Sequence, residues 1–85
     1  MSTHTSLYTV VTSTRVALST QETIKRSGAY YDSESARTRK DLLAAGQDPL
    51  STVLGRIVRG TDKKAYRIRQ NDGSSMEIWI DEVIL

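Results

Sequence analysis

Arginines and a tryptophan in the last third of the chain have the types and spacing needed to bind a polyanion. Arg67, Arg69 and Trp79 alternate with apolar residues, so we expect them on one face of a strand pair. Guanidinium groups donate paired hydrogen bonds to phosphates, and an exposed indole can stack on a base. We therefore predict a binding protein without enzymatic activity, with DNA or RNA as the first candidate partner. The candidate binding residues are Arg56, Arg59, Lys64, Arg67, Arg69 and Trp79.

Other roles are open for the same side chains. The face can simply be solvated, or a helix can cover Trp79, or the indole can lie beneath Arg67 in a cation and ring pair joined to Glu77. Tryptophan and arginine are also enriched at the energetic centres of protein interfaces. The alternative function is therefore a small protein-protein interaction module, a regulator or inhibitor of a larger protein of the kind that mobile elements or phages encode.

Residues that carry catalysis or bind metals are scarce in this chain. His4 is the only histidine and stands near the start, and there is no cysteine to act as a nucleophile or thiolate ligand. Glu77 and Asp81 are expected on one strand face with Trp79 between them, which suits salt bridges better than an acid and base pair. The run at 71–73 is not a calcium loop, because the position five residues before Gly73, where an aspartate ligand is needed, is Ile68. We therefore predict no enzyme, no cofactor and no metal.

Length, composition and charge are those of a small globular domain. The chain has 85 residues, of which 38% are hydrophobic and 26% charged, so we expect a single domain over residues 1–85. The net charge of +2 is unevenly distributed, because cations dominate between Arg56 and Arg69 and acids dominate from Asp72 onward. The lack of cysteine, of a secretory signal and of a long apolar run favours a cytoplasmic protein with no membrane partner.

The first half of the chain is expected to form a strand and two helices. Apolar residues on both sides of the run from Ser6 to Ser13 predict a strand that is covered on both faces. The capping box at residues 19–22 predicts a short helix from Thr20 to about Ser27, which Gly28 ends in the left-handed conformation.

A second helix is predicted from Ser33 to Ala45, with Asp32 or Ser33 as its N-cap and Gly46 as its terminator. Pro49 then prevents helical continuation. The helical periodicity assigns one set of residues to the core: Ala36, Leu42, Leu43 and Ala45. It assigns another set to water or a partner: Arg37, Arg39 and Lys40.

The last part of the chain alternates apolar and charged residues in three runs, which predicts an antiparallel meander that begins near Thr52. In the second hairpin, only a three-residue loop at 71–73 keeps this alternation in register. The predicted cross-strand pairs are Ile68 with Met76 and Tyr66 with Ile78 on the apolar face, and Arg67 with Glu77 on the polar face.

The first hairpin has no equally clear loop. Either Arg56 or Arg59 therefore shares the polar face with Arg67 and Arg69. At least one helix is expected to cover the apolar face, which consists of Ile57 or Val58, Tyr66, Ile68, Met76, Ile78 and Ile80.

The segment GRIVRGTDKKAYRIRQNDGSSMEIWIDEVI resembles consecutive strands of small β-barrels of the SH3-like and S1/OB kind. The resemblance lies in a glycine-led first strand, a Y-x-I second strand, a D-G turn and an apolar third strand, all within residues 52–85. Such barrels often bind RNA, DNA or protein segments across this sheet. The resemblance implies that role for Tyr66, Arg67, Arg69 and Trp79, although the strand and helices before the meander depart from the barrel order.

The expected fold class is therefore α+β, with an N-terminal strand and two short helices followed by a three-stranded antiparallel β-meander. A free edge strand in such a sheet would also permit a homodimer through strand pairing.

Overall fold

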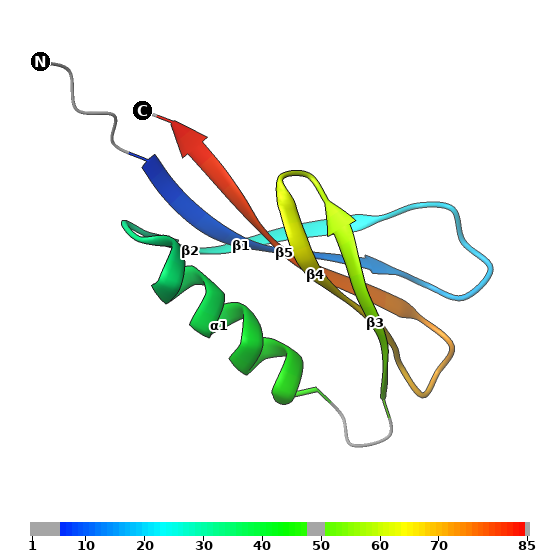
Figure 1. Ribbon diagram of the computed structural model, residues 1–85. Helices are drawn as coiled ribbons and strands as arrows, with labels where there is room; N and C mark the ends of the chain where they lie inside the picture. Colours follow the sequence, from blue (N-terminus) through cyan, green and yellow to red (C-terminus); the bar gives the residue numbers. More distant parts are fainter. Residues whose placement is uncertain (1–5, 48–50, 85) are drawn as a thin grey trace, which may run out of the picture.

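The computed structural model describes residues 6–47 and 51–84, and it has an α+β fold with one open antiparallel sheet. The predictions for His4 and Pro49 lie outside these residues. The strands are ordered β2-β1-β5-β4-β3 across the sheet, and the helix packs against one face (Figure 1). No helix in the described ranges is long and apolar enough to cross a membrane. The elements are β1 (Ser6–Arg15), β2 (Thr23–Tyr30), α1 (Ser33–Ala45), β3 (Thr52–Arg59), β4 (Asp62–Arg69) and β5 (Ser75–Ile84).

The first predicted helix is wrong, because residues 23–30 form strand β2. Ser19 does cap an amide, accepting from Gln21 N at 3.2 Å, but it does so inside a turn closed by Ser19 N donating to Val16 O at 3.0 Å. Beyond this turn, Thr23–Ser27 pairs with Val10–Thr14 of β1. The ladder satisfies backbone groups that a helix of one or two turns would leave unpaired at both ends.

Helix α1 runs over the residues predicted for the second helix. Asp32, one of the two candidates, is the N-cap, and its Oδ1 accepts from Ser35 N at 2.7 Å. The backbone N–H of Gly46 donates to Leu42 O at 2.9 Å at the other end. The local capping signals therefore located this helix correctly.

The predicted register of the β4–β5 hairpin is confirmed. Ile68 pairs with Met76, Tyr66 with Ile78, and Arg67 with Glu77. Gln70 N donates to Ser74 O at 2.8 Å, which closes the three-residue loop at 71–73, and Gly73 has the positive φ of +87° that this loop requires.

The main core lies between α1 and the sheet. Its fully buried members are Val10, Ile68 and Ile78, and the side chains packed around them are Tyr30, Leu43, Ala44, Tyr66 and Met76. Two residues assigned to this core are outside it, because Leu42 is 59% exposed and Ala45 is also exposed. Ala44 takes part instead.

The first hairpin resolves the choice between Arg56 and Arg59. Arg56 pairs with Tyr66 and lies on the α1 side of the sheet, while Ile57 pairs with Ala65 and lies on the opposite side. Ile57 or Val58 was predicted to join the core beneath α1, and neither does. Ile57 packs with Trp79 on the opposite side of the sheet, and Val58 is exposed. Irregularities in the β3–β4 ladder at 53–55 and 57–59 shift the register, which simple alternation cannot reveal.

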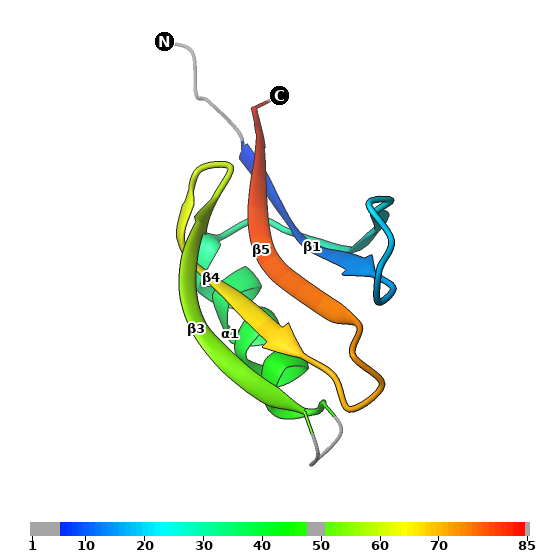
Figure 2. The same cartoon turned by 90° about the vertical axis from the view of Figure 1, so that its right-hand side faces the viewer.

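The sheet is not closed into a barrel. Strands β2 and β3 form its two edges, with all five strands in one open layer (Figure 1). The face away from α1, hereafter the open face, is consequently not covered by another element of the described chain (Figure 2). Side chains on this face come from β1, β2, β3, β4 and β5: Val11, Ser13, Arg15, Arg26, Ile57, Arg59, Ala65, Arg67, Arg69, Glu77, Trp79 and Asp81.

Candidate functional site

The open face brings together Arg59, Arg67, Arg69 and Trp79 of the predicted binding residues. Arg56 and Lys64 lie on the other side of the sheet. The Arg56 guanidinium stacks over the Tyr66 ring at 3.8 Å from its centroid, and the Lys64 carbonyl accepts from Lys40 Nζ at 3.0 Å.

Trp79 forms the apolar centre of the open face but is not itself exposed. It packs with Val11, Ala65 and Ile57, and only 5% of its surface is accessible. Its Nε1–H donates to Asp81 Oδ1 at 3.1 Å. The prediction of an exposed indole for base stacking is therefore wrong, because the ring is needed to bury the apolar strip of this face.

Arg59 covers the indole. Its guanidinium lies 4.2 Å from the centroid of the Trp79 ring, the cation and ring arrangement proposed for Arg67 as one alternative. Arg59 Nη1 donates to Glu77 Oε1 at 2.6 Å and to Glu22 Oε1 at 3.0 Å. Arg59 thus joins the tryptophan to two carboxylates that come from separate parts of the chain.

Further arginines surround this centre. Arg67 donates through Nε and Nη2 to Glu77 Oε2 at 3.2 and 3.0 Å. Arg26 reaches Asp81 at 3.4 Å, and Arg15 lies 3.6 Å from Glu22. Arg69 forms no ion pair within residues 6–47 and 51–84.

Exposure differs between the carboxylates and three arginines of this network, whereas the side chain of Arg59, 29% exposed, is as buried as the carboxylates. The carboxylate side chains of Glu22, Glu77 and Asp81 are 18–30% exposed, whereas those of Arg15, Arg26 and Arg67 are 49–63% exposed. The three carboxylates and Arg59 therefore lie deeper, and the side chains of Arg15, Arg26 and Arg67 lie outermost. Because arginines also outnumber carboxylates here, the surface presented to solvent is positive.

Hydrogen bonding within the network sets the charge of Glu22. The pKa of Glu22 is lowered mainly by the hydrogen bond from Arg59, and next by that from Ser13 Oγ at 3.0 Å. The same Glu22 hydrogen bond raises the pKa of Arg59. Both groups are therefore charged throughout the physiological pH range.

Three members of this surface were missed in the sequence. Glu22 and Arg26 lie in the segment predicted as a helix, and Arg15 lies between that segment and the strand predicted to end at Ser13, so none of the three was assigned to a sheet face. The Thr23-Ile24 pair, with its β-branched side chains, is a weak strand signal that could have placed them.

The opposite side of the sheet contains a buried ion pair instead of a solvated charge. Lys40 was predicted to face water or a partner, but its side chain is 1% exposed and its Nζ donates to Asp62 Oδ2 at 2.9 Å. Asp62 also accepts from Ile80 N at 3.0 Å and from Lys64 N at 2.9 Å. Its carboxylate bridges β4 and β5 beyond Tyr66 and Ile78, the last pair of their ladder.

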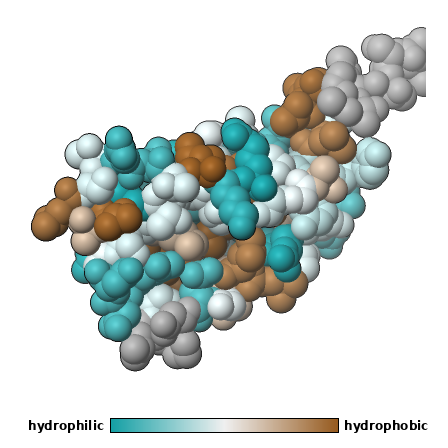
Figure 3. All heavy atoms as spheres, turned by 180° about the vertical axis from the view of Figure 1, so that it is seen from behind, coloured by the Kyte–Doolittle hydropathy of each residue, from teal (hydrophilic) through white to brown (hydrophobic). Residues whose placement is uncertain are grey.

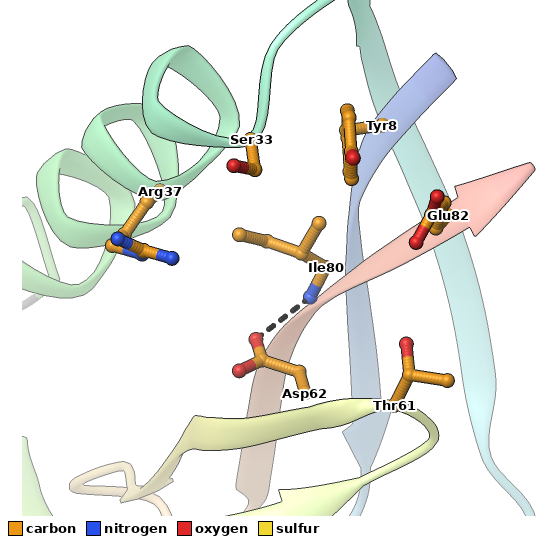
Figure 4. Close-up of a pocket in the computed structure, with 7 residues that line it drawn as sticks. All are labelled: Tyr8, Ser33, Arg37, Thr61, Asp62, Ile80 and Glu82. Carbon is orange, nitrogen blue, oxygen red and sulfur yellow. Dashed lines mark hydrogen bonds between the residues drawn. The ribbon is translucent and has the colours of Figure 1, made fainter. Parts of the chain in front are cut away.

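A cavity of about 190 Å³ lies beside this bridge, between the start of α1 and the ends of β1 and β5 (Figure 4). Arg37 and Glu82 place opposite charges at its wall. The side chains of Tyr8, Ser33 and Thr61 also line it and form no hydrogen bond with the rest of the described chain. This cavity is polar and separate from the arginines of the open face.

No family model matches the chain, and neither a curated protein nor a solved structure matches it.

Proposed function

We propose that the protein binds nucleic acid through the open face, with its arginines in contact with the phosphate backbone. The observation that carries this proposal is the layering of charge, in which Arg15, Arg26 and Arg67 are more exposed than the carboxylates that orient them. Arginine is the side chain best suited to phosphate, because its planar fork offers several donors in a fixed geometry.

The ion pairs of the open face leave donors free for a phosphate. Arg67 uses Nε and Nη2 on Glu77, and Arg26 uses Nη2 on Asp81, out of the five N–H groups that each guanidinium carries. Glu77 and Asp81 thus hold the arginines in place while their outer edges remain available. This preorganisation lowers the conformational entropy lost on binding.

The mode of binding is backbone recognition without base reading by Trp79. The indole is covered by Arg59, so its contribution is to support that guanidinium. Contacts to phosphates fix position but carry no direct sequence information. We therefore expect affinity that varies little with sequence and falls steeply with salt.

Titration of labelled DNA and RNA, single-stranded and duplex, at about 50 and 200 mM salt tests the proposal. Some four phosphate contacts would lower the affinity roughly a hundredfold over this range. The variant Arg15→Gln/Arg26→Gln/Arg67→Gln should lose binding and most of the salt dependence. No binding to any of these nucleic acids at 50 mM salt would refute the proposal.

A matched control removes the same charge from the other side of the sheet. Arg37, Arg39 and Lys64 are exposed and form no side-chain ion pair within the described residues. The variant Arg37→Gln/Arg39→Gln/Lys64→Gln should keep nearly all of the affinity. Equal losses in both variants would mean that net charge, and not the open face, is responsible.

A second candidate function is docking of another protein at the end of β5. Val83 and Ile84 are 50% and 68% exposed, and the ladder with β4 stops at Ile78, so this end of β5 offers an edge for strand addition. Isolation of one stoichiometric partner that survives nuclease treatment, and that Val83→Asp no longer retains, would favour this function.

A further inference from the structure

The loop between β1 and β2 ends in an apolar tip. Leu18 is fully exposed at its apex, and Val16, the first residue of the same turn, is 67% exposed. Ile24, paired with Ser13 in the adjoining ladder, is 47% exposed. The view from behind shows hydrophobic side chains protruding at the end of the molecule where this loop lies (Figure 3). Aliphatic side chains that protrude together at one tip, with a third exposed on the adjoining strand, mark a candidate interaction site.

The backbone at Leu18 makes this exposure more unusual. Leu18 has φ +64°, and it is the only non-glycine residue with positive φ in the described chain. It occupies the third position of the turn that the Ser19 N to Val16 O hydrogen bond closes. Glycine or asparagine is the usual residue at a turn position with positive φ, because most other residues, leucine included, are strained there. A strained leucine with no contact in the fold indicates a use outside it.

The surroundings of the tip are cationic. Arg15 stands at its base on the open face, and Arg26 follows on the same face of β2, opposite Val11. The nearby carboxylate, Glu22, is turned inward to Arg59, with Oε1 at 3.0 Å from Nη1. The tip therefore continues the positive surface of the open face and adds an apolar end to it.

We propose that Leu18 acts as an apolar wedge, entering between adjacent base pairs of a DNA duplex whose phosphates contact the open face. This inference rests on the proposed function. Leucine is among the side chains that proteins insert into base steps, where it unstacks the bases and kinks the duplex. The closed turn presents Leu18 to solvent, and Arg15 and Arg26, on the open face below it, would contact the flanking phosphates.

Charge and size favour DNA over the other surfaces that could cover this tip. Cationic flanks complement phosphate on both sides of a base step. The side chains of Val16, Leu18 and Ile24 together carry fewer carbon atoms than one myristoyl chain, which alone gives only marginal membrane binding. One side chain, by contrast, is sufficient to open a base step.

The test compares the unmodified protein with Leu18→Gly on duplexes that contain 2-aminopurine and carry a dye pair at their ends. The unmodified protein should raise the 2-aminopurine fluorescence and shorten the end-to-end distance, which report unstacking and bending. Leu18→Gly should lose both signals and bind duplex DNA at least tenfold more weakly, while binding single strands with unchanged affinity and salt dependence. Its midpoint of thermal unfolding should rise, because glycine relieves the positive φ. If the variant is at least as stable as the unmodified protein, misfolding cannot explain a loss of unstacking and bending in Leu18→Gly.

Leu42→Gln is the matched control, since it removes an exposed leucine from α1. It should behave as the unmodified protein does. Duplex binding with the same unstacking and bending in Leu18→Gly would overturn the wedge and leave the proposed function standing. Absence of binding to all nucleic acids would overturn both. Binding to vesicles of phosphatidylcholine and phosphatidylserine that Leu18→Gly loses, without duplex distortion by the unmodified protein, would also overturn the wedge and assign the tip to a membrane surface.

Discussion

The Arg59 guanidinium lies 4.2 Å from the centroid of the Trp79 ring and, at the same time, within 2.6 Å of Glu77 Oε1. One side chain therefore buries the apolar centre of the open face and anchors its carboxylates. This double role explains why the tryptophan is inaccessible on a sheet face that no other element of residues 6–47 and 51–84 covers. It also makes Arg59 the residue on which the arrangement of the neighbouring arginines depends.

Replacement of Arg59 by alanine should uncover Trp79. The free energy of unfolding is expected to fall by about 1–2 kcal/mol, because both the cation and ring contact and the packing of the aliphatic stem are lost. Trp79 is the sole tryptophan of the chain, so its emission maximum and its quenching by acrylamide report this site alone. Arg59→Met keeps the stem and should leave the indole largely shielded. An unchanged emission maximum in Arg59→Ala would contradict this account.

The buried pair of Lys40 and Asp62 should respond strongly to loss of one partner. Lys40→Met leaves the Asp62 carboxylate, 10% exposed, without its counter-ion, and we expect a loss of about 3 kcal/mol or more in the free energy of unfolding. The double variant Lys40→Met/Asp62→Asn removes both charges and should recover part of this loss. Urea denaturation of the four members of the cycle measures the coupling. Additive effects would show that the two residues act independently.

Short-range sequence features correctly predicted the helix and the hairpin whose backbone hydrogen bonds join residues close together in the chain. The N-cap Asp32 and the terminator Gly46 delimited α1, and the parity of the residues on each side of the loop at 71–73 set the register of β4 and β5. The capping signal at 19–22 failed because the ladder between β1 and β2 competes for the same backbone groups. Whether a segment forms helical hydrogen bonds or pairs with another strand depends on that other strand, so the residues of the segment alone do not decide it.

The binding face was harder to predict for the same reason. Lys40 has the type and spacing of a solvent-facing helix residue, and only the position of Asp62 on another element explains its burial. Likewise, alternation alone left either Arg56 or Arg59 on this face, and only the pairing of Ile57 with Ala65 places Arg59 beside Trp79. The set of arginines and tryptophan could be identified from alternation, but their exposure could not.

Gly28 should not tolerate a side chain. Its φ is +72°, and a Cβ atom would lie 2.9 Å from the ring of Tyr30, which packs against the main core. Gly28→Ala is therefore expected to lower the free energy of unfolding by about 1–3 kcal/mol, measured by urea denaturation. Gly60→Ala is a suitable comparison, since φ is +58° there but the nearest atom, Asp81 Oδ1, is 3.4 Å away. Equal losses at both positions would show that the Tyr30 contact contributes nothing.

The ion pairs of the network predict a loss of stability in acid. The pKa of Glu22 is lowered from its ordinary value of 4.5, mainly by the Arg59 hydrogen bond. The pKa of Asp62 is also lowered, from 3.8, because the hydrogen bonds from Lys40, Lys64 and Ile80 outweigh the opposing effect of burial. A carboxyl group with a lowered pKa in the folded state stabilises the protein above its unfolded pKa, and this stabilisation is lost as pH falls through the folded value.

The urea midpoint should therefore be nearly constant from pH 7 to about 5 and should decrease below about pH 4.5. Glu22→Gln should lower the midpoint at pH 7 and flatten its dependence on pH, so that the two curves converge in acid. Because Arg59 is the main cause of the shift at Glu22, Arg59→Met should flatten the curve to a similar extent. Curves for the unmodified protein and Glu22→Gln that stay parallel down to pH 3 would contradict the assignment of this dependence to Glu22.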